Sequence, residues 1–185
     1  YYKGWHSILK VYKIKSYFKG KIVVFYMLIG VLALQGAVSE HCRMLDSLNV
    51  KNIKVRKITE IKNIDGLIMP GGESTTLRKL LVNANLWDFL RDSNLPVMGT
   101  CAGAILLGKS DDITFEKMDY IIDRNFYGRQ IDSFEETLEI EDYPNFRGVF
   151  IRAPAITDIG KTKAIAYCRN KVVGCVEGQN MALTF

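Results

Sequence analysis

Cys101 has the neighbours of a nucleophilic thiol. It is the middle residue of a Gly-x-Cys-x-Gly segment, residues 99–103, which leads from a short apolar run into a helical apolar pattern. A sharp strand-to-helix turn needs small residues, because side chains at Gly99 or Gly103 would clash where the backbone doubles back, as in the serine elbow of hydrolases. The partial positive charge at the start of the helix favours a thiolate. We therefore predict a nucleophilic Cys101 with a lowered pKa, although a small buried cysteine is also common in protein cores.

A second turn of small residues precedes this one. Residues 64–70 are typical of a buried strand, and Gly71 and Gly72 follow it directly. Two glycines at a strand end leave backbone N–H groups available for a developing oxyanion, which acyl chemistry on a thiol requires. Ser74 or Thr75 is expected to cap the next helix. Gly71-Gly72 alone could be a plain tight turn, but α/β sheets place their sites at the carboxyl ends of strands, where both turns are predicted.

The apolar patterns predict the elements that position these turns. Strands are expected at residues 28–34, 53–56, 67–69 and 96–99, and helices at residues 38–48, 75–82, 86–91 and 102–107. Further strands, several of them antiparallel because their connections are short, are expected at residues 118–123, 136–141, 148–151, 163–168, 171–176 and 181–185. This order predicts a single α/β domain in which helices cover a sheet.

Five motifs occur in a fixed order at residues 70–76, 99–103, 124–130, 132–134 and 150–154. Together they closely resemble the glutaminase subunits of pyridoxal 5'-phosphate synthase, a family of class I (triad) glutamine amidotransferases. The resemblance runs from Met27 to Phe185 and implies a three-layer, flavodoxin-like class I glutaminase fold with a mostly parallel central sheet. It also implies hydrolysis of L-glutamine to glutamate and ammonia. The ammonia passes to a separate synthase subunit that assembles the vitamin B6 cofactor, and the glutaminase itself is expected to need no cofactor.

The resemblance also assigns individual residues. It makes Cys101 the nucleophile, and the predicted position of this turn opposite Gly71-Gly72 would supply backbone oxyanion donors from Gly72 and Ala102. The substrate contacts that it implies are Gly72, Glu73, Ser74, Arg124, Ile151 and Arg152. A guanidinium suits a free amino acid because it grips a carboxylate through two parallel hydrogen bonds. A lone arginine is more often an ordinary ion-pair residue, so Arg124 and Arg152 are assigned to the substrate only because they lie within the motifs.

The resemblance further implies a histidine held by a glutamate, in a His-Pro-Glu sequence directly after a strand that ends in Phe. The printed sequence ends at Phe185, and its histidines, His6 and His41, do not match that position. We expect residues 27–185 to be a glutaminase domain without its C-terminal end, lacking the catalytic His and Glu and the last helix. His41, early in the first predicted helix, is expected to be structural. A non-catalytic module that binds glutamine or the synthase is the alternative function.

The basic charge of the chain is concentrated in residues 1–26. This segment has six lysines and no acidic residue, which leaves 19 basic and 20 acidic residues in the rest of the chain. Nucleic-acid binding is therefore not expected, since it depends on clustered cations. Residues 1–26 lie outside the resemblance. Their aromatic residues among lysines would also suit an anionic membrane surface, which is a weaker alternative.

Two further patterns bear on the compartment. The apolar run at residues 22–34 is too short to span a bilayer, and cleavage after it would remove the first predicted strand, so a secretory signal is rejected. The four cysteines, Cys42, Cys101, Cys168 and Cys175, show no Cys-x-x-Cys pair and no metal-ligand spacing with histidine. We expect a reduced, cytoplasmic protein without a bound metal or a membrane association.

Overall fold

A nine-stranded sheet lies at the centre of the computed structural model, which describes residues 15–18, 21–24, 27–126, 133–140 and 145–185. The helices are α2 (Val38–Ser47), α3 (Ile58–Ile61), α4 (Ser74–Asn83), α5 (Trp87–Asp92) and α6 (Ala102–Leu107). The strands of the first half are β1 (Lys15–Phe18), β2 (Lys21–Val24), β3 (Leu28–Leu32), β4 (Lys51–Val55), β5 (Gly66–Met69), β6 (Val97–Thr100) and β7 (Ile121–Asp123). Those of the second half are β8 (Phe134–Ile140), β9 (Phe146–Phe150), β10 (Ala155–Asp158), β11 (Lys163–Cys168), β12 (Lys171–Glu177) and β13 (Asn180–Leu183).

The order of the strands in this sheet is β4-β3-β5-β6-β13-β12-β11-β8-β9. The neighbours from β4 to β13 pair in parallel, and those from β13 to β9 pair antiparallel. The predicted α/β class is confirmed. The sheet is mixed, however, because short connections join β11, β12 and β13 and can only return the chain antiparallel. The expected parallel pairing thus holds for the half of the sheet that carries the two glycine-rich turns.

Some elements differ from the prediction. The strand expected at residues 118–123 is reduced to β7, which pairs with β10 in a separate two-stranded sheet. Neither β10 nor the short helix α3 was predicted, because each is only four residues long and has no clear periodicity. Helix α6 has the predicted bounds.

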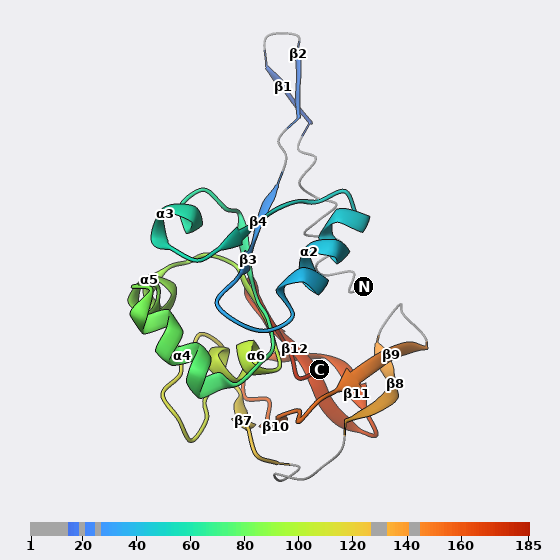
Figure 1. Ribbon diagram of the computed structural model, residues 1–185. Helices are drawn as coiled ribbons and strands as arrows, with labels where there is room; N and C mark the ends of the chain where they lie inside the picture. Colours follow the sequence, from blue (N-terminus) through green and yellow to red (C-terminus); the bar gives the residue numbers. More distant parts are fainter. Residues whose placement is uncertain (1–14, 19–20, 25–26, 127–132, 141–144) are drawn as a thin grey trace.

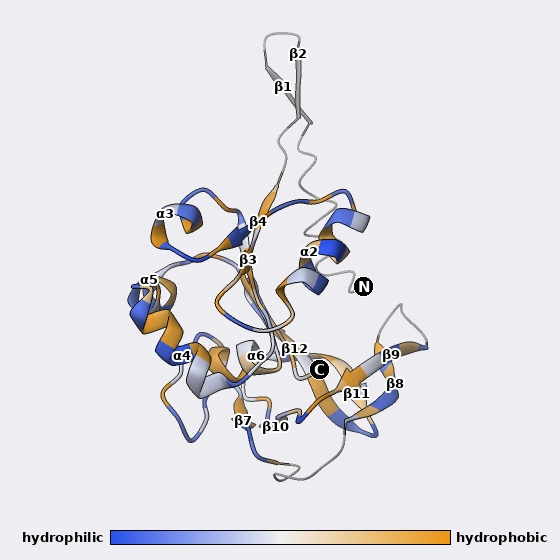
Figure 2. Cartoon of the chain, viewed as in Figure 1, coloured by the Kyte–Doolittle hydropathy of each residue, from blue (hydrophilic) through white to orange (hydrophobic). Residues whose placement is uncertain are grey.

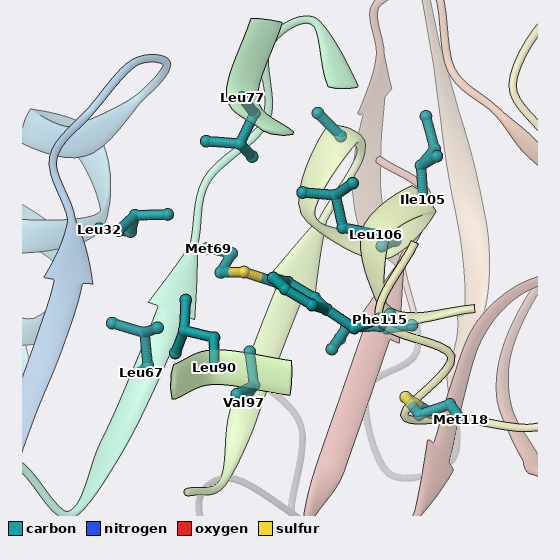
Figure 3. Packing of buried hydrophobic residues seen from close by; sticks show 14 of the residues in the cluster. Leu32, Leu67, Met69, Leu77, Leu90, Val97, Ile105, Leu106, Phe115 and Met118 are labelled. Atoms are coloured by element: carbon teal, nitrogen blue, oxygen red, sulfur yellow. The ribbon is translucent and has the colours of Figure 1, made fainter. Parts of the chain in front are cut away.

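Helices cover both faces of the parallel half, as Figure 1 shows. Successive side chains of a strand point to opposite faces. Leu67 and Met69 of β5 therefore pack with the helices α4, α5 and α6, whereas Ile68 between them packs in the cluster that contains Leu45 of α2. Figure 3 shows the first of these clusters, in which Leu77 of α4 and Leu106 of α6 approach Met69. The three layers that the resemblance implied are confirmed.

Helix α2 covers its face of the sheet with little apolar surface. Leu45 is its one fully buried residue, and Figure 2 shows most of the helix in the hydrophilic colour, in contrast to the central strands.

Among the residues that the structure describes, no helix has both the length and the hydropathy to cross a membrane.

The basic segment that precedes the sheet contains two short strands. β1 and β2 pair antiparallel, with Lys15 opposite Val24, and form a sheet of their own. Residues 1–14, with His6, lie outside the described residues. The division of the chain at residue 26 stays a prediction.

Candidate active site

Cys101 lies at the turn between β6 and α6. Its φ of 47° and ψ of −103° are seldom adopted by residues other than glycine, and such strain is found at functional sites. A Cβ atom at Gly99 would lie 2.4 Å from the carbonyl carbon of Gly103, and one at Gly103 would lie 2.3 Å from the carbonyl oxygen of Met69. The predicted need for small residues on both sides of the cysteine is therefore confirmed.

The Gly71-Gly72 turn follows β5, which pairs with β6 directly. Gly71 lies against the cysteine, since a Cβ there would be 3.2 Å from the Cβ of Cys101. Gly72 has a φ of +144°, and Gln35 holds the turn from the other side by donating from Nε2 to the carbonyl oxygen of Glu73 over 2.8 Å. Gln35 was missed from the sequence, because a lone glutamine after a strand gives no specific signal.

Two backbone N–H groups converge on the sulfur of Cys101. The N–H of Gly72 comes from the glycine turn and that of Ala102 comes from the first residue of α6, and both lower the pKa of the Cys101 thiol, as backbone donors near the sulfur do. The structure thus brings together three residues that the sequence assigned to one site. Pairs of fixed backbone donors of this kind stabilise negative charge in acyl transfer.

Burial raises the pKa of the Cys101 thiol, and the hydrogen bonds from Gly72 and Ala102 offset this only in part. The predicted lowering of the pKa is therefore wrong for the protein without ligand. The physical reason is that desolvation disfavours the thiolate more than the donors at the start of α6 favour it. The thiolate of this cysteine is therefore less favoured than that of an exposed cysteine.

Glu73 caps helix α4. Its carboxylate accepts hydrogen bonds from the N–H groups of Thr75 (2.9 Å) and Thr76 (2.6 Å) and from the hydroxyl of Thr76 (2.6 Å). Burial raises the pKa of Glu73, but these hydrogen bonds outweigh it and the net pKa is lowered. The prediction that Ser74 or Thr75 caps the helix is wrong, because Ser74 is already the first helical residue and is buried. The Glu73 side chain is thus committed to the helix.

Arg124, directly after β7, reaches the start of the same helix. Its Nη1 atom donates to the hydroxyl oxygen of Thr75 over 2.9 Å. Two of the five motifs therefore meet in space, although 49 residues separate them in the chain. The later part of the third motif, residues 127–130, and Asp132 lie outside the described residues.

Ile151 and Arg152 follow β9, the edge strand of the sheet. Ile151 is 62% exposed, and Arg152 is an exposed residue with a φ of 47°. No hydrogen bond or ion pair in the described part of the chain links either residue to Cys101. Their role in substrate binding stays a prediction.

His41 lies beside the residue that precedes the cysteine. Its Nε2 atom is 3.5 Å from the hydroxyl oxygen of Thr100, and burial lowers the pKa of its imidazole. This contact ties α2 to the end of β6, which agrees with the structural role expected for His41.

Other surfaces of the described residues offer less chemistry. They contain no cluster of three or more histidine, cysteine, aspartate or glutamate residues that could hold a metal ion. A hollow of about 560 Å³ is lined by residues 91–95, 115–117 and 177–180, at the start of β6 and so at the opposite end of that strand from Cys101. It contains none of the residues that the sequence assigned to the site.

Comparison with known proteins agrees with the geometry of this site. The sequence model of the SNO glutamine amidotransferase family matches residues 31–185. The chain is 44% identical over 164 residues to the pyridoxal 5'-phosphate synthase subunit PdxT of Methanocaldococcus jannaschii, with 86% of this chain and 88% of the relative covered. It is 46% identical over 167 residues to the PdxT subunit of Methanocorpusculum labreanum, with the same coverage.

Solved structures give the same result. A crystal structure of a glutamine amidotransferase superposes with a TM-score of 0.78 at 37% identity, covering 85% of this chain and 88% of that one. A putative GMP synthase subunit from Thermoplasma acidophilum has a TM-score of 0.64 at 18% identity, with 88% of this chain and 85% of that one covered, and supports the fold alone.

Proposed function

The chain belongs to the SNO glutamine amidotransferase family, and we propose that it hydrolyses glutamine through Cys101. The observation that carries this proposal is the strained Cys101 at the start of α6, against which the Gly71-Gly72 turn lies, so that backbone N–H groups of Gly72 and Ala102 are near the sulfur. A strained cysteine with two fixed donors is suited to acyl transfer from an amide, which is the reaction that a glutaminase performs.

In the proposed reaction the thiolate of Cys101 attacks the side-chain amide carbon of glutamine and forms the carbon–sulfur bond. The electron pair of the carbonyl moves to oxygen, and this oxyanion accepts hydrogen bonds from Gly72 and Ala102. The carbon–nitrogen bond then breaks, and the leaving nitrogen takes a proton and departs as ammonia. Water hydrolyses the thioester, which releases glutamate and restores the thiol.

Proton transfer in these steps needs a base. We do not assign this role to His41, because its Nε2 atom contacts Thr100 and not the cysteine. The base that the family resemblance implies belongs to the His-Pro-Glu motif, which does not occur in residues 1–185. General acid–base assistance contributes roughly 100- to 10,000-fold to the rate.

Glutamine is proposed to lie between the start of α4 and the arginines. The backbone of Gly72, Glu73 and Ser74 lines the side of the nucleophile, and Arg124 and Arg152 take the α-carboxylate, with Ile151 beside Arg152. Because the Glu73 carboxylate caps α4, its contribution to substrate binding is limited to the backbone.

The acceptor of the ammonia is proposed to be a separate synthase subunit. The relatives carry the name of a subunit of pyridoxal 5'-phosphate synthase, so we propose that this chain supplies ammonia for vitamin B6 synthesis within such a hetero-oligomer.

Ammonia release from glutamine tests the proposal, measured with the synthase subunit present and on a protein that includes the implied His-Pro-Glu motif. Cys101→Ala should abolish release, while Cys42→Ala, which changes a half-buried thiol of α2, should keep it. His41→Gln should also keep most of the activity. A chloroketone analogue of glutamine should add its mass to the peptide that contains Cys101 and to no other peptide. Undiminished release by the Cys101→Ala protein would overturn the assignment.

A further inference from the structure

Asp112, in the segment between α6 and β7, is the centre of a cluster of charged side chains beside the proposed site. Its Oδ2 atom accepts hydrogen bonds from the hydroxyl of Thr75 (3.1 Å) and from Nη1 of Arg124 (3.0 Å). Its Oδ1 atom is 3.5 Å from Nη2 of Arg78. The side chain is only 20% exposed, so water screens these contacts less than it would at the surface.

The guanidinium of Arg124 is fixed at one end by this cluster. The two hydrogens of Nη1 are directed to Thr75 and Asp112, which are 2.9 and 3.0 Å away. The Nε atom is buried and makes no hydrogen bond, but it forms an ion pair with Oδ1 of Asp111, which is 3.1 Å away. A carboxylate that binds an arginine side-on uses Nε and Nη2 together. Burial and Asp111 close the Nε side, and Nη1 is committed to Thr75 and Asp112, so Nη2 is the atom left for a carboxylate ligand.

We propose that Asp112 is a positioning residue for glutamine recognition, which holds Nη1 of Arg124 against Thr75 so that its Nη2 atom faces the substrate α-carboxylate. This inference depends on the proposed function, in which Arg124 binds that carboxylate. It gives Asp112 an effect on substrate affinity without contact to the substrate. The cluster contains two aspartates, Asp111 and Asp112, and two arginines, Arg78 and Arg124, so their formal charges cancel. The orientation of the Arg124 guanidinium, and not an excess of positive charge, therefore makes it a suitable partner for the substrate carboxylate.

The connection to the nucleophile supports the proposal. Thr75 follows Glu73 by two residues and donates its N–H to the Glu73 carboxylate, so the cluster is anchored to the loop that carries Gly72. Asp112 also stays ionised near neutral pH, because the N–H of Ile113, together with Thr75, Arg78 and Arg124, lowers its pKa against the opposing effect of burial.

Steady-state kinetics of Asp112→Asn, measured in the complex with the synthase subunit, test the inference. We expect the KM for glutamine to rise about 10-fold, the lower end of what loss of one charged hydrogen-bond partner causes, while kcat changes less than about twofold. When Arg124 is already replaced by alanine, Asp112→Asn should not raise the KM for glutamine further, because Asp112 is proposed to affect binding only by orienting the Arg124 guanidinium. The inhibition constant of the α-amide of glutamine, which has no α-carboxylate, should not change.

Asp88→Asn is the matched control. Asp88 forms an ion pair with Arg91 of 2.9 Å on the surface of α5, so this variant loses an aspartate of the same kind away from the site. Its KM should equal that of the wild type.

The outcomes separate the two proposals. An unchanged KM in Asp112→Asn, together with a raised KM in Arg124→Ala, overturns the inference and leaves the proposed function intact. An unchanged KM in Arg124→Ala removes this arginine from the proposed site. The inference is also overturned if Asp112→Asn raises the KM for glutamine further in the Arg124→Ala background, or if it changes the inhibition constant of the α-amide as much as the KM. Either result assigns Asp112 a purely structural role.

Discussion

Substitution of Gly103 by alanine should disturb both the fold and the nucleophile. The new Cβ would lie 2.3 Å from the carbonyl oxygen of Met69, 2.9 Å from its Cβ and 3.1 Å from its carbonyl carbon. Two of these atoms belong to the backbone of β5, so a side-chain rotation cannot relieve the clash. Because ordinary contacts of this kind are longer than 3 Å, α6 and β5 have to move apart by about 1 Å.

The cost follows from this displacement. Overpacking of a dense core costs about 1–3 kcal/mol. In a domain of this size each kcal/mol lowers Tm by about 2–4 °C, so Tm should fall by roughly 2–12 °C. The same movement shifts the Ala102 N–H relative to the Cys101 sulfur, and a misplacement of about 1 Å can reduce the rate about 100-fold.

Differential scanning calorimetry checks the fall in Tm. Ammonia release, measured on the same preparation with the synthase subunit added, checks the fall in rate. Gly178→Asn is the control, because Gly178 has a φ of +56° with no atom within 4 Å of an added Cβ, and asparagine tolerates this conformation. It should change Tm by less than about 2 °C. A Gly103→Ala protein with the Tm and the turnover of the wild type would refute the close contact between α6 and β5.

Three further predictions concern single groups of the site. Glu73→Gln should lower the free energy of unfolding by about 0.5–2 kcal/mol, as measured by urea unfolding. Because the pKa of Glu73 is lowered in the folded state, this loss of stability should be complete above about pH 4.3 and should disappear as the pH falls through the folded pKa. The iodoacetamide reaction of Cys101 in the ligand-free protein should keep accelerating with pH beyond about 8.5, the value of an ordinary thiol, because burial raises its pKa; a plateau reached below pH 8 would contradict this. Arg152→Ala should weaken glutamine binding roughly 10- to 150-fold in titration calorimetry if this exposed arginine takes the α-carboxylate, and an unchanged Kd would remove it from the site.

The glycine-rich turns were predictable from the sequence because backbone geometry alone requires them. A chain that reverses from β6 into α6 has no room for side chains at Gly99 and Gly103. The two glycines on either side of Cys101 therefore indicate the turn in the sequence itself. The parallel half of the sheet followed from the apolar strands that lead to these turns. The positions of the N–H groups of Gly72 and Ala102 then depend on the adjacency of β5 and β6.

Other features depend on long-range contacts that no local pattern contains. The choice of Glu73 over Ser74 as the cap of α4 arises because the chain enters the helix with Ser74 already turned into the protein interior. Asp112 was missed because its partners, Thr75 and Arg78, are more than thirty residues away in the sequence and only the fold brings them together. The pKa of Cys101 was misjudged because the motif shows the start of α6 but not the depth at which the sulfur is buried.

The position of β13 has a consequence for synthesis on the ribosome. This strand lies between β6 and β12, and the carbonyl of Leu183 accepts the hydrogen bond from the N–H of Cys101 over 2.8 Å. The parallel half and the antiparallel half of the sheet therefore have no direct strand pairing until residues 180–183 have left the exit tunnel. A nascent chain arrested before residue 180 should carry a Cys101 that alkylates faster than in the finished fold, because its backbone is not yet anchored to Leu183.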